Sequence, residues 1–196
     1  MNNPFTIWFT GLPCSGKSTL ANCIGSKLYR LGLDPHILDG DEVRENLTSD
    51  LGFSKEDRLE NIKRNSYVAG LLETHGVIPI GAFITPYREG REVVRSNVDN
   101  CKLVYVKCPV GVCAERDVKG MYEKAKRGEI ENFTGISDPF EEPNNPDVVV
   151  ESHKEDELES ADRIIEEVLP ESHKPFFDNG VPHEQSVPPP RREQDS

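Results

Sequence analysis

The residues best suited to chemistry lie near the start of the chain, in the run Gly11-Leu12-Pro13-Cys14-Ser15-Gly16-Lys17-Ser18 and the adjoining Thr19. The run fits the pattern G-x-x-x-x-G-K-[ST], whose glycines let backbone N–H groups curl around phosphate oxygens. We expect Lys17 to reach the β- and γ-phosphates of ATP, and the Ser18 hydroxyl to bind Mg²⁺. A chance glycine-rich turn is the alternative, but a predicted strand before the run and a predicted helix after it favour a phosphate-binding loop.

Two carboxylates, Asp39 and Asp41, stand at the end of a second predicted strand, where ligands gather in open α/β sheets. Beside a phosphate loop, such a carboxylate is suited to binding Mg²⁺ or to accepting the proton of a substrate hydroxyl. We assign Asp39 to the metal and Asp41 to the hydroxyl, with an ordinary acidic turn as the alternative. The chain has no Asn-Lys-x-Asp run of the kind that reads guanine, which favours a kinase over a GTPase switch.

The elements that must position these residues follow a regular alternation of short apolar runs and helix-compatible stretches. Strands are predicted at residues 5–10, 36–38, 77–84, 103–106 and 147–150, and helices at 16–31, 54–75 and 155–169. Ser54 is the predicted N-cap of the middle helix, and Gly76 its stop. The pattern predicts an α/β protein of the P-loop NTPase kind, in which helices flank a parallel sheet to give three layers.

The composition of the chain limits the binding partners and the cellular compartment that we expect for it. The formal net charge of −12 argues against a nucleic-acid duplex or an anionic membrane as the main partner. The first residues lack the basic region and the apolar length of a signal or membrane span, so we expect a cytoplasmic protein. Five cysteines without a C-x-x-C pair predict reduced thiols. Cys14 is the exception, because the N–H groups of the loop could lower the pKa of its thiol.

The chain is predicted to form one kinase domain over residues 1–169 and a proline-rich polar tail over residues 170–196. The tail cannot bury enough apolar area to offset the entropy of ordering it, so we expect it to be disordered. A proline-run ligand for another protein is the alternative.

Four further runs, in order, carry a family resemblance. The first two are Leu38-Asp39-Gly40-Asp41 with Val43-Arg44, and Asp50-Leu51-Gly52-Phe53-Ser54 with Asp57-Arg58 and Glu60-Asn61-Ile62. The third is Ala82-Phe83-Ile84-Thr85-Pro86-Tyr87-Arg88, and the fourth joins Lys119-Gly120-Met121-Tyr122, Gly128-Glu129-Ile130, Phe133-Thr134-Gly135-Ile136 and Asp138-Pro139. From about residue 5 to residue 146, the chain resembles the adenylylsulfate kinase family.

The resemblance implies transfer of the γ-phosphoryl of Mg·ATP to the 3′-hydroxyl of adenosine 5′-phosphosulfate (APS), which gives the activated sulfate donor PAPS. It implies that Phe53 and Phe133 sandwich the adenine of the acceptor, with core packing as the alternative for Phe53. Aromatic faces and guanidinium forks suit an anionic, adenine-bearing molecule. The residues implied to hold the phosphosulfate and sugar are Arg44, Arg58, Asn61 and Lys119, and those implied to complete the acceptor pocket are Phe83, Ile84, Thr85 and Thr134. A solvated helix face is the alternative for Arg58.

Residues 116–139 are predicted to form a lid over both nucleotides, hinged at Gly120, Gly128 and Gly135. Closure of such a lid would exclude water and so limit wasteful hydrolysis of ATP. A plain surface loop is the alternative.

Three residues depart from the family pattern. Thr85 takes the place of a serine that was proposed to be transiently phosphorylated in bacterial members. We expect Thr85 only to line the acceptor pocket, because in-line transfer needs no covalent intermediate. Glu42 stands where asparagine is common, and Val118 replaces the proline before Lys119.

Two other functions stay open at this point. One is a P-loop kinase of the same fold that acts on another small acceptor, such as a sugar acid. The other is a nucleotide-binding regulator that switches a partner, although a switch has no use for a second nucleotide pocket. The family resemblance also suggests a homodimer, supplied with APS by a separate ATP sulfurylase.

Overall fold

A single parallel sheet organises the computed structural model, which describes residues 4–169. Its strands are β1 (Thr6–Thr10), β2 (Pro35–Asp39), β3 (Ile78–Ala82), β4 (Cys101–Lys107) and β5 (Val148–Glu151). They lie in the order β2-β3-β1-β4-β5, and every neighbouring pair is parallel. The strands therefore all end at the same edge of the sheet, where the loops that follow them meet.

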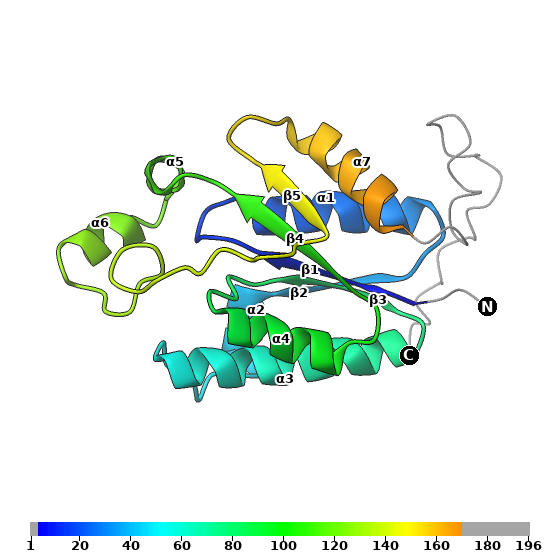
Figure 1. The fold of residues 1–196 in the computed structure, drawn as a ribbon, viewed down its shortest axis with the longest axis horizontal. Helices are drawn as coiled ribbons and strands as arrows, with labels where there is room; N and C mark the ends of the chain where they lie inside the picture. Colours follow the sequence, from blue (N-terminus) through cyan, green and yellow to red (C-terminus); the bar gives the residue numbers. More distant parts are fainter. Residues whose placement is uncertain (1–3, 170–196) are drawn as a thin grey trace, which may run out of the picture.

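The helices of the described residues lie on both faces of this sheet and beyond its carboxyl edge (Figure 1). They are α1 (Lys17–Arg30), α2 (Gly40–Asn46), α3 (Lys55–Thr74), α4 (Arg88–Asn97), α5 (Val110–Glu115), α6 (Met121–Lys126) and α7 (Glu157–Val168). One face is covered by α1 and α7, the other by α3 and α4, while α5 and α6 extend past the strand ends. The predicted three-layer α/β fold is confirmed.

The central strand β1 divides the core into two clusters. Side chains alternate between the two faces of a strand, so Ile7 and Phe9 pack with the residues of α1 and α7, whereas Trp8 packs with those of α3 and α4. All five residues of β1 are buried. The phosphate loop directly follows this strand, so it begins at a residue that is buried between the two helical layers.

The long helix α3 begins at the predicted N-cap, since the Ser54 side chain accepts a hydrogen bond from the Asp57 N–H. Its inner face is unusually polar, and Glu73 there accepts hydrogen bonds from the Thr6 hydroxyl at 2.6 Å and the Asn100 N–H at 3.0 Å. Gly70 lets α3 approach α4 closely, because a Cβ at this position would lie 2.1 Å from the Asn97 carbonyl oxygen.

Four of the described helices, α2, α4, α5 and α6, were not expected from the sequence. The predicted turn at Asp39 is the start of α2, in which the Asp39 carboxylate caps the helix by accepting the Asp41 N–H at 2.9 Å. The helix α4 has no side-chain cap and few apolar residues, so the sequence offers neither a start signal nor an apolar run there. The predicted tail over residues 170–196 lies outside the described residues. No described helix has the length and apolar character needed to cross a membrane.

Candidate active site

The phosphate loop connects β1 to α1, and its glycines are required by the backbone. Gly11 has a φ of 154° and leaves no room for a Cβ, which would lie 2.5 Å from the Val106 carbonyl oxygen. Gly16, the residue before α1, has a φ of 103°. Both conformations are favourable only for glycine. The sequence pattern therefore corresponds to a tight turn that directs N–H groups of the helix start outward.

Lys17 is buried, and three oxygens of its own loop surround its ammonium group. Its Nζ lies 2.6 Å from the Leu12 carbonyl oxygen, 3.0 Å from that of Gly11 and 3.5 Å from the Ser15 hydroxyl. Burial lowers the pKa of Lys17 to about 8. Neutral carbonyl oxygens are weaker partners than a phosphate, so an arriving triphosphate offers this ammonium a better ligand.

Ser18 and Asp39 meet at the other side of the loop. The Ser18 hydroxyl donates to Asp39 Oδ2 at 2.7 Å, while Asp39 Oδ1 is held by the Asp41 N–H. A hydroxyl and a carboxylate are hard oxygen ligands of the kind that Mg²⁺ prefers. Residues 4–169 contain no group of three or more metal-ligating side chains, so water and phosphate oxygens would have to complete a Mg²⁺ shell here.

A cavity of about 570 Å³ opens beside the loop and extends to residues that the sequence did not single out. Cys14, Lys17 and Ser18 line one side of it, and Arg116 and Ser152 line another. Ser152 links the two sides, because it accepts Arg116 Nη1 at 3.2 Å and donates to the Ser15 carbonyl oxygen at 2.7 Å. Ser152 directly follows β5, at the carboxyl edge of the sheet. This position after a predicted strand is the sequence signal that could have identified Ser152 as a site residue.

An exposed aromatic ring and two nearby guanidinium groups form a further cluster of predicted site residues. Phe53 is 55% exposed, and the guanidinium carbons of Arg44 and Arg58 lie 4.3 and 5.5 Å from the centre of its ring. Arg58 is only 7% exposed, and burial lowers the pKa of both arginines. Core packing of Phe53 and a solvated face for Arg58 are therefore wrong. Both arginines remain charged at neutral pH and form an anion-attracting surface.

Arg58 also joins α3 to the predicted lid. Its Nε donates to the Phe53 carbonyl oxygen at 3.1 Å, and its Nη2 donates to the Asn132 carbonyl oxygen at 2.6 Å. Asp138 lies 3.8 Å from Arg58 and accepts the Tyr87 hydroxyl at 2.8 Å. The start of α3 and residues 132–138 of the predicted lid thus share one polar network.

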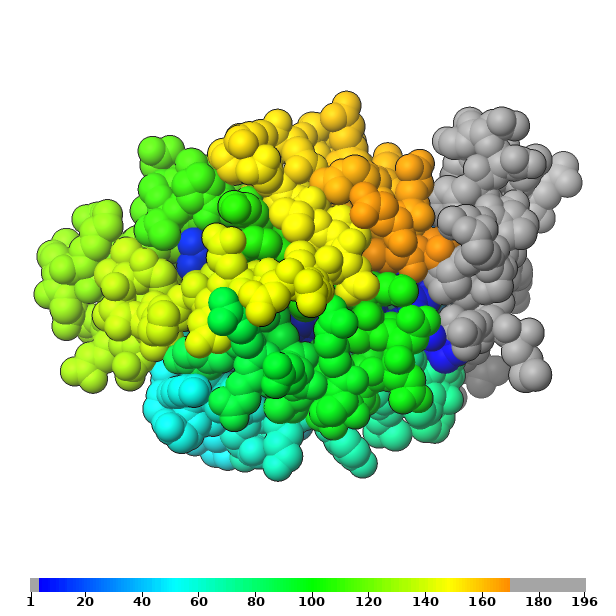
Figure 2. All heavy atoms as spheres, viewed as in Figure 1, coloured from blue at the N-terminus to red at the C-terminus, as the bar shows by residue number. Residues whose placement is uncertain are grey.

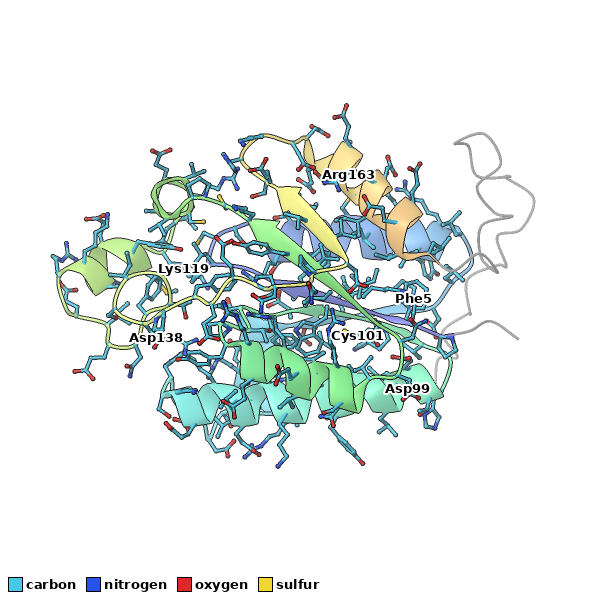
Figure 3. The ribbon with its side chains drawn as sticks, viewed as in Figure 1. Phe5, Asp99, Cys101, Lys119, Asp138 and Arg163 are labelled. Carbon is cyan, nitrogen blue, oxygen red and sulfur yellow. The ribbon has the colours of Figure 1, made fainter. Side chains whose placement is uncertain are left out.

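The lid packs on the phosphate loop instead of lying free on the surface. The Tyr122 hydroxyl donates to the Pro13 carbonyl oxygen at 2.9 Å, and the Tyr122 and Phe133 rings meet edge to face at 4.9 Å. Lys119 Nζ lies 2.9 Å from Asp41 Oδ2. In Figure 3, Lys119 and Asp138 lie at the lid end of the molecule, far from Phe5 and Asp99. The plain surface loop considered as an alternative is not what the structure contains.

Other predicted site residues lie deeper than expected. Thr85 is 1% exposed, and its hydroxyl accepts the Trp8 indole N–H at 3.0 Å. Phe83 is buried against Trp8, with ring centres 4.8 Å apart, and the Ile84 carbonyl oxygen accepts the Thr10 hydroxyl. The structure therefore places the side chains of Thr85 and Phe83 in the core, and the expectation that Thr85 lines the pocket does not match its burial.

Burial also affects two further predicted site residues, Cys14 and Thr134. Burial raises the pKa of the Cys14 thiol, which is opposite to the direction expected from the loop N–H groups. Thr134 is buried, and its hydroxyl has no hydrogen-bond partner among residues 4–169.

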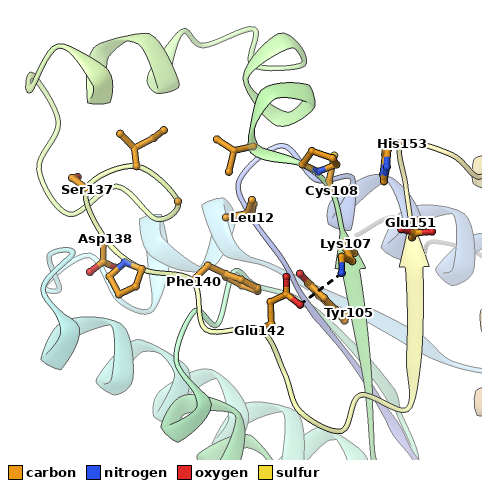
Figure 4. A pocket seen from close by; sticks show the side chains of 15 residues that line it. Leu12, Tyr105, Lys107, Cys108, Ser137, Asp138, Phe140, Glu142, Glu151 and His153 are labelled. Carbon is orange, nitrogen blue, oxygen red and sulfur yellow. Dashed lines mark ion pairs between the residues drawn. The ribbon is translucent and has the colours of Figure 1, made fainter.

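A second cavity, of about 700 Å³, lies between the ends of β4 and β5, the last residues of the predicted lid and the segment that follows them (Figure 4). Leu12 is the only predicted site residue in its lining, whose charged members include the ion pair of Lys107 and Glu142 at 3.7 Å. In the space-filling view, blue atoms from the first part of the described chain are visible in a hollow beside the lid (Figure 2).

Comparison with known proteins agrees with this arrangement. The sequence model of the adenylylsulphate kinase family matches residues 3–151, which is well over half of the chain. The chain belongs to the adenylylsulphate kinase family. An adenylyl-sulfate kinase of Halothermothrix orenii is 52% identical over 161 residues, covering 82% of this chain and 87% of that protein. One of Thermodesulfovibrio yellowstonii is 49% identical over 163 residues, covering 82% of each.

A solved member of the adenylylsulphate kinase family has the same fold. The APS kinase of Mycobacterium tuberculosis, in complex with AMPPNP and APS, is 38% identical with a TM-score of 0.81. The match covers 85% of this chain and 98% of that one. The family resemblance, the P-loop fold and the class of enzyme predicted from the sequence are confirmed.

Proposed function

We propose that this chain transfers the γ-phosphoryl of Mg·ATP to the 3′-hydroxyl of APS to make PAPS, with the residues described above in defined roles. The observation that carries this proposal is the position of Asp39 and Asp41, two residues apart at the end of β2. Asp39 is bonded to Ser18 of the phosphate loop, and Asp41 is paired with Lys119 of the lid. The start of α2 is thus connected both to the phosphate loop and to residue 119 of the lid, which suits direct transfer between a donor and an acceptor.

On the donor side, Lys17 and the loop N–H groups hold the phosphates of ATP in the cavity that also contains Arg116. Ser18 and Asp39 would hold Mg²⁺, directly or through water, and the ion would supply positive charge beside the transferring phosphoryl. Lys17 stabilises the same charge from the loop. The remaining loop residues, from Gly11 to Thr19, shape this cradle.

On the acceptor side, Asp41 orients the acceptor hydroxyl and takes its proton. Phe53 and Phe133 sandwich the adenine, while Arg44, Arg58, Asn61 and Lys119 bind the charged groups and the sugar. An exposed ring with two guanidinium groups close to it supports this assignment, because the combination suits an aromatic base that carries anionic substituents. The M. tuberculosis APS kinase holds AMPPNP and APS in one complex, which supports two nucleotide sites in the same fold.

The wider context follows from the family. We propose that the protein is a cytoplasmic homodimer and that a separate ATP sulfurylase supplies APS. Residues 1–169 are the kinase domain, with residues 116–139 as its lid. Light scattering on the purified protein gives twice the chain mass if the dimer exists, and the chain mass if it does not.

Replacing Lys17 tests the donor side of this proposal. The substitution Lys17→Ala removes the only cation among residues 11–19, so we expect PAPS formation to fall by at least about 100-fold. Turnover is measured by the release of ADP with APS present, and circular dichroism checks that the variant is folded. Wild-type turnover by a folded Lys17→Ala protein would refute the donor site.

A further inference from the structure

A buried polar cluster lies beside the proposed acceptor pocket. It consists of Thr48, which follows α2, and of Asn61 and Asn65 on α3, with exposed fractions of 1%, 7% and 0%. The Thr48 hydroxyl lies 2.7 Å from Asn61 Oδ1, and Asn65 Nδ2 lies 3.3 Å from the same oxygen. Because buried polar groups destabilise a fold unless they are hydrogen-bonded, these contacts constrain the orientation of Asn61. Asn65 Oδ1 is the one atom of the cluster that is buried without a hydrogen-bond partner among residues 4–169.

The orientation of the Asn61 amide follows from its neighbours. Asn65 Nδ2 donates to the Asn61 backbone carbonyl oxygen at 2.7 Å, and the reversed amide would place two oxygens against each other. Asn65 thus directs an N–H toward the Asn61 side chain, so the atom of Asn61 that faces it must be the oxygen, which accepts the hydrogen bond. Thr48 donates to that oxygen as well. Both contacts are made by the oxygen of the Asn61 amide. The N–H₂ group of Asn61 therefore points away from Thr48 and Asn65.

The nitrogen end of Asn61 is available for a ligand. Asn61 Nδ2 has no hydrogen-bond partner among residues 4–169, and it is not one of their fully buried unpartnered atoms, so it remains accessible. Arg58 precedes Asn61 by three residues and lies on the same face of α3, one turn away. Since Arg58 bonds to Phe53, the free N–H₂ group adjoins the proposed acceptor site.

We propose that Thr48 is a positioning residue that holds the Asn61 amide with its N–H₂ group toward the acceptor nucleotide, where it donates to an oxygen or ring nitrogen. This inference rests on the proposed function. Thr48 is itself fixed, because its N–H donates to the Val43 carbonyl oxygen at 3.2 Å and its own carbonyl oxygen accepts the Leu51 N–H at 3.1 Å. It acts through Asn61 without touching the substrate.

Loss of the Thr48 hydroxyl has a specific consequence. The oxygen end of Asn61 keeps only the longer contact with Asn65, so the amide can rotate. A rotated amide presents oxygen to the electron-rich atoms of the acceptor and repels them. The hydrogen bond between Asn61 and the acceptor is then lost both in the ground state and in the transition state. The KM for APS therefore rises, while kcat is retained.

The test compares Thr48→Val, which keeps the shape of the side chain, with Thr48→Ser, which keeps the hydroxyl. We expect Thr48→Val to raise the KM for APS about 3- to 10-fold, the effect of one hydrogen bond, and to leave kcat and the KM for ATP within about twofold. Thr48→Ser restores the wild-type KM. In an Asn61→Ala background, Thr48→Val adds nothing further, because the group that it positions is gone.

Several results would overturn the inference. They are a wild-type KM for APS in Thr48→Val, an equal rise in the KM for ATP, or a failure of Thr48→Ser to restore binding. If Thr48→Val does not fold, the comparison of Thr48→Ser and Thr48→Ala with the wild type serves in its place. A wild-type protein that does not turn over APS overturns the proposed function and this inference together. Wild-type turnover with an unaffected folded variant overturns the inference alone.

Discussion

At the residue scale, Lys17 combines two opposing demands. The phosphate loop needs its positive charge, yet burial lowers its pKa to about 8 and favours the neutral form. The contacts with the loop carbonyl oxygens keep the ammonium in place. Binding of a triphosphate adds negative charge beside it and raises its pKa again.

The pH dependence of ATP use follows from the lowered pKa of Lys17. The free enzyme holds a protonated Lys17 below a pH of about 8 and loses that charge as the pH rises through this value. We therefore expect kcat/KM for ATP to fall about tenfold per pH unit above the pKa. At saturating ATP, kcat stays level to a higher pH, because bound phosphate keeps Lys17 charged. A kcat/KM for ATP that stays flat well above pH 8 would contradict this role.

Thr85 offers a second test at this scale. The substitution Thr85→Val keeps a β-branched side chain but removes the acceptor of the Trp8 indole N–H. We expect the free energy of unfolding to fall by about 1–3 kcal/mol, because a buried donor loses its partner, while turnover is retained. Urea unfolding and the ADP-release assay measure the two quantities, with Thr85→Ser as the control. Loss of nearly all turnover in a folded Thr85→Val protein would mean that the hydroxyl takes part in transfer.

At the element scale, the lid is held by contacts of unequal strength. Tyr122 is buried and bonded to the phosphate loop, whereas the ion pair between Lys119 and Asp41 is largely exposed, with 65% and 80% of the two side chains accessible. Exposed ion pairs contribute little to stability. A substrate can therefore replace Asp41 as the partner of Lys119 at small cost.

Lys119→Ala separates binding from stability. We expect the KM for APS to rise about tenfold, because a charge-assisted contact with the acceptor is lost, and the melting temperature to stay unchanged. The matched control is Lys124→Ala, an exposed lid lysine on α6 that should change neither quantity. Equal kinetic effects of the two substitutions would show that Lys119 has no specific role.

The elements also show what a sequence can and cannot predict. The strands and the helices α1, α3 and α7 follow from apolar runs, spacing and caps such as Ser54. The helix α2 was missed because Asp-Gly-Asp suits a turn as well as a helix start, although Asp39 followed by Glu42 is close to a capping pattern. The depth of Thr85 was not predictable, because only the packing of Trp8 against β3 and α3 decides it.

The nucleotide cavity illustrates the same limit. The phosphate loop is contiguous, so its residues could be identified from spacing alone. Arg116 and Ser152 lie far apart in sequence and meet only because α5 and β5 end at the same edge of the sheet. Interactions of this kind depend on the tertiary fold, and no local pattern encodes them.

At the scale of the whole molecule, the parallel sheet brings every loop of the site to one edge. The phosphate loop after β1, Asp39 at the end of β2 and Ser152 after β5 lie at this edge, and α5 and α6 extend beyond it (Figure 1). In the proposed function these three parts make up the donor side, and α3 and residues 116–139 make up the acceptor side. The two alternatives considered from the sequence, a kinase for another acceptor and a nucleotide-dependent regulator, differ from an APS kinase in what they require of an acceptor pocket.

The most direct test measures ADP release by the purified protein with Mg·ATP and APS, AMP, gluconate or no acceptor. We expect fast turnover with APS, formation of PAPS in equal amount to ADP, and little release with the other additions. Turnover with gluconate or AMP but not with APS would identify a different kinase. Slow release that is the same with and without acceptors would contradict phosphoryl transfer to APS and favour a nucleotide-dependent regulator.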